Sequence, residues 1–225
     1  MDIEKRAGVL FDVDGTLVDT PYLHTVSWWE ALRQADQAVP MAEIHRAIGM
    51  GFDQLLHHLL GPERDRDADQ RIRDAHDSLF AEFFGRLRPL PGAADLLRAC
   101  AARGLRVALA TSAGDHELAA LRVALNADDV IAPITTRVDA APGRPTSDVV
   151  SAALDSAELD PARVVFVGDS VWDVAAAGDL HIPCIGLTCG GTSRGELAGA
   201  GAIAVFEDPA DLLTALAESP VAALA

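Results

Sequence analysis

The chain has 225 residues and a mass of 23.7 kDa, which is long enough to bury a hydrophobic core without disulfides or a structural metal. Hydrophobic residues make up 50% of the sequence and charged residues 23%, so a disordered, collagen-like or fibrous protein is excluded. The 34 acidic residues outnumber the 18 Lys and Arg, and the net charge of -16 repels phosphate backbones and anionic lipid headgroups. We therefore expect neither a nucleic-acid nor a membrane partner.

The cysteines and the N-terminus bear on the cellular compartment. Cys100, Cys184 and Cys189 are an odd number without a CxxC spacing, which indicates free thiols and a reducing environment. The N-terminus reaches acidic residues before an apolar signal segment can form, and no stretch has the roughly 18 apolar residues of a membrane-spanning helix. We expect a cytoplasmic protein that is a monomer or a weak homodimer.

The first predicted strand, residues 8–11, runs directly into a pair of acids, Asp12 and Asp14, and then into Gly15 and Thr16. Parallel sheets bind ligands at the carboxyl ends of their strands. One carboxylate of such a pair can attack phosphorus, while its neighbour protonates the leaving oxygen and then deprotonates the attacking water. The alternative is a structural Asp-Gly turn, which is common at strand ends.

A helical block follows the first strand. Residues 20–88 contain no convincing strand, and their apolar residues have helical spacing, with Pro21 at the first turn of the first helix. A block of this length predicts an inserted domain on two linkers. We assign residues 19–87 to an all-α cap, and residues 1–18 with 88–225 to the core.

Beyond this block, short apolar runs alternate with helical segments, which is typical of a parallel sheet covered by helices on both faces. The sequence therefore predicts an α/β sandwich. A helix is predicted at residues 93–102, and further strands at residues 105–110, 164–167, 182–187 and 203–206. Asp160-Pro161 and Asp208-Pro209 predict turns or helix starts.

Polar residues also follow the second and third predicted strands. Thr111 and Ser112 offer hydroxyl and backbone donors that can hold an oxyanion, although taken alone they fit a helix N-cap better. Asp169 and Asp173 are carboxylates of the kind that bind a hard divalent cation. We expect the three strand ends to converge on one crevice.

Together these motifs resemble the haloacid dehalogenase superfamily of phosphohydrolases, subfamily I with an α-helical cap, over essentially the whole chain. The resemblance implies a Rossmann-like core. The first family motif, D-x-D-G-T, is matched by Asp12, Asp14, Gly15 and Thr16; the second, an apolar strand ending in Ser or Thr, by Thr111; and the fourth, G-D-x-x-x-D, by Gly168, Asp169 and Asp173.

The resemblance implies a role for each acid. Asp12 is the expected nucleophile and Asp14 the expected general acid and base. Mg²⁺ is expected to bind a carboxylate oxygen of Asp12, the backbone carbonyl of Asp14 and Asp169, while Asp173 orders the water molecules of the metal.

The phosphate-binding residues include one departure from the family. The resemblance implies that the Thr111 side chain and the Ser112 amide bind the phosphoryl group. The third motif usually carries Lys, but this chain has Arg144 in Gly143-Arg144-Pro145. A guanidinium there can screen the Asp12 carboxylate from an incoming phosphate, and Lys5 is the only lysine of the chain.

Comparison with other members of the superfamily limits the reactions that this chain is expected to catalyse. Asp14 disfavours dehalogenases, which usually lack this second acid, and the absence of Lys from residues 20–88 excludes phosphonate-cleaving members, which form a Schiff base with a cap lysine. His24 has the spacing found in β-phosphoglucomutase-like enzymes, but Phe52 stands where these carry a phosphate-binding Arg. We predict that His24 and Phe52 face the substrate; for His24, proton relay and simple cap packing both remain open.

The sequence thus predicts a Mg²⁺-dependent phosphatase that hydrolyses phosphomonoesters of small metabolites through an aspartyl-phosphate intermediate. The first alternative is a β-phosphoglucomutase-like phosphosugar mutase. The second is a catalytically weak binding homologue, because Arg144 replaces the usual lysine. The uncharged loop at residues 49–52 suggests a substrate whose non-phosphate part is not strongly anionic.

Overall fold

The computed structural model describes residues 5–132 and 147–224. Its centre is a five-stranded, all-parallel sheet in the order β2-β1-β3-β4-β5, which confirms the predicted α/β class and its five strands. The strands are β1 (Arg6–Asp12), β2 (Arg106–Ala110), β3 (Leu159–Gly168), β4 (Cys184–Leu187) and β5 (Ala204–Phe206).

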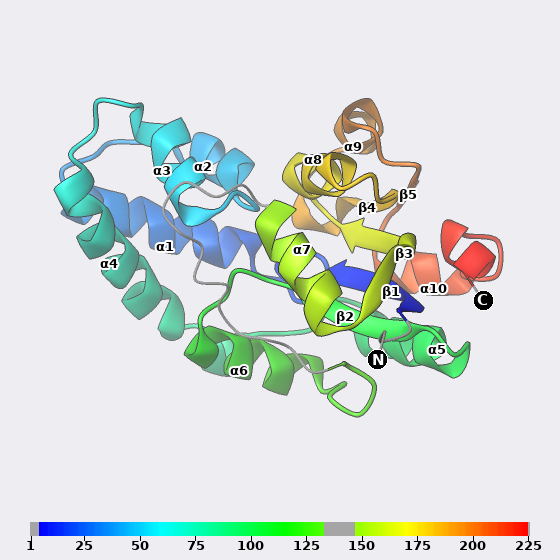
Figure 1. Ribbon diagram of the computed structural model, residues 1–225. Helices are drawn as coiled ribbons and strands as arrows, with labels where there is room; N and C mark the ends of the chain where they lie inside the picture. The colour runs from blue at the N-terminus through cyan, green and yellow to red at the C-terminus, as the bar shows by residue number, and fades with distance from the viewer. Residues whose placement is uncertain (1–4, 133–146, 225) are drawn as a thin grey trace.

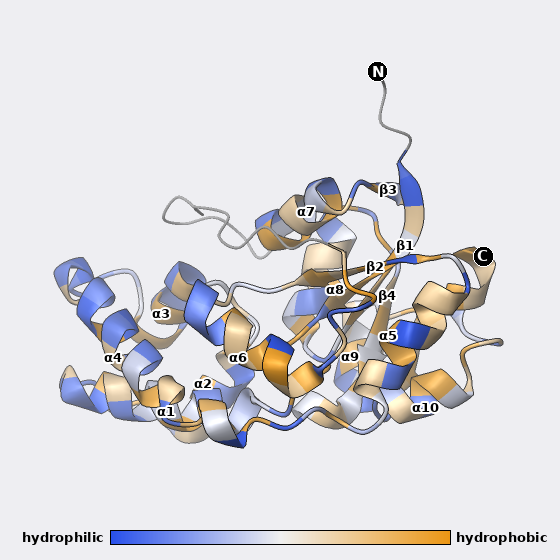
Figure 2. Cartoon of the chain, turned by 90° about the horizontal axis from the view of Figure 1, so that it is seen from below, coloured by the Kyte–Doolittle hydropathy of each residue, from blue (hydrophilic) through white to orange (hydrophobic). Residues whose placement is uncertain are grey.

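Helices cover both faces of this sheet (Figure 1). The side chains of β1 alternate between the faces: Val9 and Phe11 belong to one buried cluster and Leu10 to the other. The first cluster is completed by α5 (Ala93–Ala102), α6 (Asp115–Leu125) and α10 (Pro209–Thr214). The second is completed by α7 (Ser147–Ser156), α8 (Val171–Asp179) and α9 (Arg194–Ala200). In Figure 2 the strands between these helices are mostly hydrophobic, as a sheet buried on both faces requires.

The cap is a helical lobe that lies beside the core in both views (Figure 1, Figure 2). It has a hydrophobic cluster of its own, which includes Trp28, Leu32, Ile44 and Leu56. Its α-helices are α1 (Pro21–Gln34), α2 (Met41–Ala47), α3 (Phe52–Leu60) and α4 (Asp69–Ala81).

The two chain segments that join cap and core run side by side. Val18 and Pro89 form an antiparallel bridge, the Asp19 amide donates to the Arg88 carbonyl at 3.0 Å, and the Leu90 amide donates to the carbonyl of Leu17 at 2.9 Å. We propose that these paired segments form the boundary of the cap, whose limits at residues 19 and 87 stay a prediction.

The two predicted turn or helix-start sites have different outcomes. The Asp160 side chain accepts a hydrogen bond from the Ala162 amide at 3.1 Å, which is a local turn, but the strand continues through it. Asp160-Pro161 lies inside β3, where the chain advances from Leu159 to Val164 while β1 advances only from Arg6 to Gly8. The extra residues form a bulge at the edge of the pairing. By contrast, Asp208-Pro209 does begin a helix: the Asp208 side chain accepts a hydrogen bond from the Asp211 amide at 2.9 Å, and α10 starts at Pro209.

Gly8 provides a test of this sheet. A Cβ at this position would lie 2.3 Å from the Arg106 carbonyl oxygen and 2.4 Å from Leu159 Cδ2. We expect Gly8→Ala to lower the free energy of unfolding by about 3 kcal/mol, because the contacted backbone cannot move aside. Gly178→Ala, in α8 with open space around its Cβ, should instead raise it by about 0.5–1 kcal/mol. Urea unfolding of both variants distinguishes these results, and equal midpoints would contradict the packing argument.

The cysteines and the helix lengths add two observations. Cys100 and Cys184 are buried, Cys189 is half-buried and none is in a disulfide, as predicted. The longest α-helix in the described residues, α1, has 14 residues, and no described helix combines the length and the apolar character needed to cross a bilayer.

Candidate active site

Three acids meet where β1 and β3 end. Asp12 is the last residue of β1, Asp169 directly follows β3, and Asp173 lies in the first turn of α8. Because β1 and β3 are neighbours in the sheet, their ends bring these side chains together, and one carboxylate oxygen of each lies within 4.8 Å of the others. The predicted convergence of the first and third strand ends is therefore present.

The electrostatics of this cluster favour a bound cation. Burial, together with the negative charges of Asp173 and Asp169, raises the pKa of Asp12 well above its ordinary value of 3.8. Burial and the charge of Asp173 likewise raise the pKa of Asp169. Thr16 Oγ1 donates a hydrogen bond to Asp169 Oδ1 at 3.0 Å, and a Cβ at Gly190 would lie only 1.6 Å from Asp169 Oδ2. These residues fit a hard divalent cation, because it would neutralise crowded oxygens that the chain holds in place.

Asp173 is partly committed to the helix that carries it. Its Oδ2 accepts hydrogen bonds from the Ser170 amide at 3.0 Å and from Ser170 Oγ at 2.7 Å. The Ser170 hydroxyl in turn accepts from the Asp173 amide, which completes a capping box at the start of α8. An oxygen that already accepts two hydrogen bonds suits the predicted supporting role better than direct metal binding, and that role remains a prediction.

Asp14 faces the cap. Its Oδ1 accepts a hydrogen bond from Thr20 Oγ1 at 2.7 Å and lies 3.2 Å from Nε2 of His24 in α1. Burial acts to raise the pKa of Asp14, but the hydrogen bonds from His24 and Thr20 and the charge of His24 outweigh it and lower the pKa below 3.8. Asp14 is therefore ionised in this arrangement, as a general base must be.

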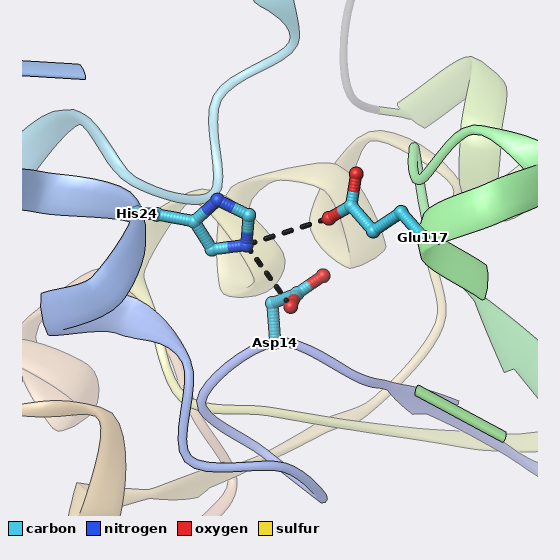
Figure 3. Close-up of side chains that lie close together, drawn as sticks. All are labelled: Asp14, His24 and Glu117. Atoms are coloured by element: carbon cyan, nitrogen blue, oxygen red, sulfur yellow. Dashed lines mark hydrogen bonds and ion pairs between the residues drawn. The ribbon is translucent and has the colours of Figure 1, made fainter. Parts of the chain in front are cut away.

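His24 is the centre of a buried polar chain (Figure 3). Besides Asp14, its Nε2 faces Glu117 Oε1 of α6 at 3.5 Å, and its Nδ1 lies 3.1 Å from Nε2 of His76 in α4. His76 Nδ1 in turn lies 3.0 Å from Asp77, whose side chain is 61% exposed. The chain thus runs from Asp14 at the floor of the site to Asp77, an exposed residue that lines the same cavity.

The hydrogen bonds of this chain require one extra proton on the two histidines. Nδ1 of His76 donates to Asp77 and Nε2 of His24 donates to Asp14, so a third proton lies between the rings and one ring is an imidazolium. The pKa directions assign that proton to His24: the bond to Asp14 raises the pKa of His24 despite its burial, whereas burial lowers that of His76.

His24 makes the contacts that each of the two interpretations requires, and its role as a proton relay stays a prediction. It packs in the cap, with its ring stacked on Phe80 at 3.8 Å between centroids, and it also reaches Asp14 across the cap–core boundary. His76 and Glu117 were not predicted as site residues from the sequence. Neither stands next to a motif; the four-residue spacing of His76 and Phe80 was the one signal that they share a face of α4.

Glu117 predicts a measurable pH dependence of stability. Burial and the negative charge of Asp14 raise the pKa of Glu117 from 4.5 to about 7. Protonated Glu117 makes its full contribution to the free energy of unfolding below pH 4.5. This contribution, about 3 kcal/mol, is lost as the pH rises through 7. In Glu117→Gln this loss should disappear, because the amide does not titrate. Urea unfolding at pH 5 and pH 8 tests it, with Glu82→Gln on the exposed cap surface as the control; parallel pH curves for the wild type and Glu117→Gln would contradict the assignment.

A cavity of about 780 Å³ joins these groups between cap and core. Of the predicted site residues, those that line it are Asp12, Asp14, His24, Phe52, Thr111, Ser112, Asp169 and Asp173. The Thr111 hydroxyl accepts a hydrogen bond from the Ala113 amide at 3.1 Å, while the N-cap of α6 is Gly114. Thr111 and Ser112 are thus not the helix cap, and the Thr111 proton is free to reach a ligand. The cavity is also lined by Arg73, which the sequence analysis did not single out.

Arg144, the cation predicted from the third motif, lies outside the described residues. Its catalytic and substrate-binding roles therefore remain predictions. Lys5 stands just before β1, at the end of the sheet opposite the acids, and pairs with Asp155 at 3.7 Å. It does not supply the missing lysine.

A parallel α/β core with buried acids at its strand ends, covered by a helical cap, defines an enzyme that works on a ligand enclosed between two lobes. The family model of the haloacid dehalogenase-like hydrolases matches residues 7–181. The chain belongs to this family of hydrolases, which confirms the family and the enzyme class predicted from the motifs.

Individual relatives agree with this assignment. Phosphoglycolate phosphatase of Rhodospirillum rubrum is 32% identical over 216 residues, which cover 91% of this chain and 88% of that protein. A hydrolase from Pseudomonas syringae has a TM-score of 0.87 at 34% identity, covering 95% of this chain and 99% of that one. A putative beta-phosphoglucomutase from Bacteroides vulgatus has a TM-score of 0.82 at 20% identity over 96% and 89% of the two chains, and therefore shares the fold.

Proposed function

We propose that this enzyme is a Mg²⁺-dependent phosphatase that hydrolyses small phosphomonoesters through an aspartyl-phosphate on Asp12. The single observation that carries the proposal is the meeting of Asp12, Asp169 and Asp173 within 4.8 Å on the wall of a cavity between core and cap. The relatives support the phosphatase activity, since the curated ones are named phosphoglycolate phosphatases.

The metal would be held by Asp12, Asp169 and the backbone carbonyl of Asp14, with Asp173 ordering its water. When bound, it would neutralise the negative charge that Asp12 and the phosphoryl oxygens bring together. Thr111 and Ser112 would hold the phosphoryl group from the β2 side of the cavity. Arg144 is proposed to share that charge, as a substitute for the lysine of related enzymes.

The reaction then proceeds in two steps. A carboxylate oxygen of Asp12 forms a bond to phosphorus as the bond to the leaving alkoxide breaks, and the alkoxide takes a proton through Asp14. That proton is available because His24, 3.2 Å from Asp14, is an imidazolium. Asp14 next accepts a proton from water, whose oxygen attacks phosphorus and releases phosphate from Asp12.

Substrate turnover by the purified protein tests this proposal. Phosphate release should be measured from p-nitrophenyl phosphate, 2-phosphoglycolate, a polyol phosphate, a nucleotide and β-glucose 1-phosphate, each with Mg²⁺ and with EDTA. We expect Mg²⁺-dependent phosphate release. Conversion of β-glucose 1-phosphate to glucose 6-phosphate without phosphate release would instead establish the mutase, and no turnover of any ester would establish a binding homologue.

A further inference from the structure

We propose that Arg73 determines the specificity of this site by binding a carboxylate of the substrate, so that the enzyme favours short phosphomonoesters of hydroxy acids over neutral phosphate esters. The inference rests on the proposed function, because it names the substrate class of the same cavity. Arg73 lies on α4 of the cap, and its side chain lines the cavity that also contains Asp12 and Asp14.

The guanidinium of Arg73 is held in place but lacks a polar partner. It lies over the ring of Phe52, 3.7 Å from the centroid, which fixes the plane of the group. Its Nε is buried without a hydrogen-bond partner, and no ion pair joins Arg73 to a carboxylate among residues 5–132 and 147–224. Nη1 and Nη2 are not among the buried atoms, and within the described residues neither has a hydrogen-bond partner, so these outer nitrogens are the donors that a ligand in the cavity can meet.

Two other arginines with a buried unpartnered nitrogen show the contrast. Arg64 has such an Nη1, but its other nitrogens bind Asp69 at 2.9–3.2 Å. Arg106 has such an Nε, yet it approaches Glu158 at 4.0 Å. Neither of them lines the cavity, so among these three only Arg73 combines an unpartnered nitrogen with access to the substrate.

The charge of the cavity explains why an arginine at this place matters. In the described part of the chain, Arg73 is the single Lys or Arg that lines the cavity, against a wall of acids that includes Asp12, Asp14, Asp169 and Asp173. A second anionic group on a substrate would be repelled by these acids unless it met a cation. The planar guanidinium offers paired N–H donors that match the two oxygens of a carboxylate.

This arrangement changes the expectation drawn from the uncharged loop at residues 49–52. That Phe52 takes the place of the phosphate-binding arginine of mutase-like enzymes stays a prediction, but α4 places the guanidinium of Arg73 on the ring of Phe52. The cap therefore does supply a cation, from a different helix and further along the chain. An acidic substrate is also in keeping with the names of the curated relatives.

Two substrates of similar size separate recognition of the carboxylate from general activity. The value of kcat/KM should be measured with Mg²⁺ for 2-phosphoglycolate and for 2-hydroxyethyl phosphate, in which a hydroxymethyl group replaces the carboxylate. We expect Arg73→Gln to lower kcat/KM for 2-phosphoglycolate about 100-fold, mainly through KM, and to change that for 2-hydroxyethyl phosphate by less than about 3-fold. Arg73→Lys should recover part of the loss, because it restores the charge without the paired donors.

The control is Arg71→Gln, which removes an exposed arginine from the same helix and should change neither substrate. Equal losses for both substrates in Arg73→Gln would overturn the inference, because they indicate a structural role, and so would no loss for either. A third substrate, ethylene glycol bisphosphate, carries a second phosphate in place of the hydroxyl group of 2-hydroxyethyl phosphate. If Arg73→Gln lowered kcat/KM for this substrate alone, the inference would also be overturned, because Arg73 would then bind a second phosphate. If the wild type hydrolyses 2-hydroxyethyl phosphate at least as well as 2-phosphoglycolate, the inference fails while the phosphatase stands; if Mg²⁺ supports hydrolysis of neither, both fail.

Discussion

Asp12→Asn is expected to lower phosphatase turnover by about 10⁴-fold or more while the fold is retained. The amide has nearly the shape of the carboxylate, but its nitrogen cannot form the acyl phosphate. It also removes one of three crowded negative charges, so the variant should unfold at a temperature no lower than that of the wild type without metal. Initial rates on the best substrate and a thermal melt measure the two effects.

Trapping the intermediate makes this prediction sharper. Rapid acid quench of the wild type with substrate should give a protein whose mass is increased by one phosphoryl group, and Asp12→Asn should give none. Asp95→Asn, on the exposed surface of α5, serves as the control and should retain full turnover. Substantial turnover by Asp12→Asn, with phosphate released but no phosphoryl-enzyme, would show that water attacks phosphorus directly.

Removal of Mg²⁺ is the second change with a large expected effect. EDTA should abolish turnover and lower the free energy of unfolding by about 3 kcal/mol relative to Mg²⁺ at 100 times its Kd, because the metal binds the folded protein alone. The reason lies in the buried acids: burial and mutual repulsion raise the pKa of both Asp12 and Asp169, so ionising them without a cation is costly.

Asp169→Asn isolates this electrostatic effect from catalysis. Its oxygen can still accept the hydrogen bond from Thr16, so the local structure should persist. Without metal at pH 7 this variant should be more stable than the wild type, and Mg²⁺ should stabilise it little. Thermal melts with and without Mg²⁺ give the comparison. An unchanged Mg²⁺ shift in Asp169→Asn would mean that the metal binds elsewhere.

Local patterns were sufficient to predict the framework of the protein. The strand at residues 8–11 was recognisable because a central parallel strand is apolar on both faces, and Val9, Leu10 and Phe11 are all buried. The helix at residues 93–102 was predicted with the bounds of α5 because Gly92 and Arg103-Gly104 mark its ends. Strand β3 was predicted too short, since its first half is a bulge with exposed residues at 161–163 and thus lacks an apolar run.

The acids were predictable for a related reason. Asp12, Asp14 and Asp169 directly follow strands, or stand within two residues of one, and the ends of parallel strands share one edge of the sheet. Their roles came from the family motifs, and those roles are the subject of the mutational tests above. Nothing comparable marks Arg73, His76 or Glu117, which stand on helices among other polar residues.

The sequence by itself determined the α/β core, the inserted helical cap, the family and the acids at the strand ends, because each depends on neighbours in the chain or on motif spacing. The tertiary structure alone decided which cap residues face those acids. That choice depends on how α1, α3 and α4 are rotated and packed, which brings His76 to His24 and stacks Arg73 on Phe52 within the cap. His24 reaches Asp14 only when the cap has also packed against the core.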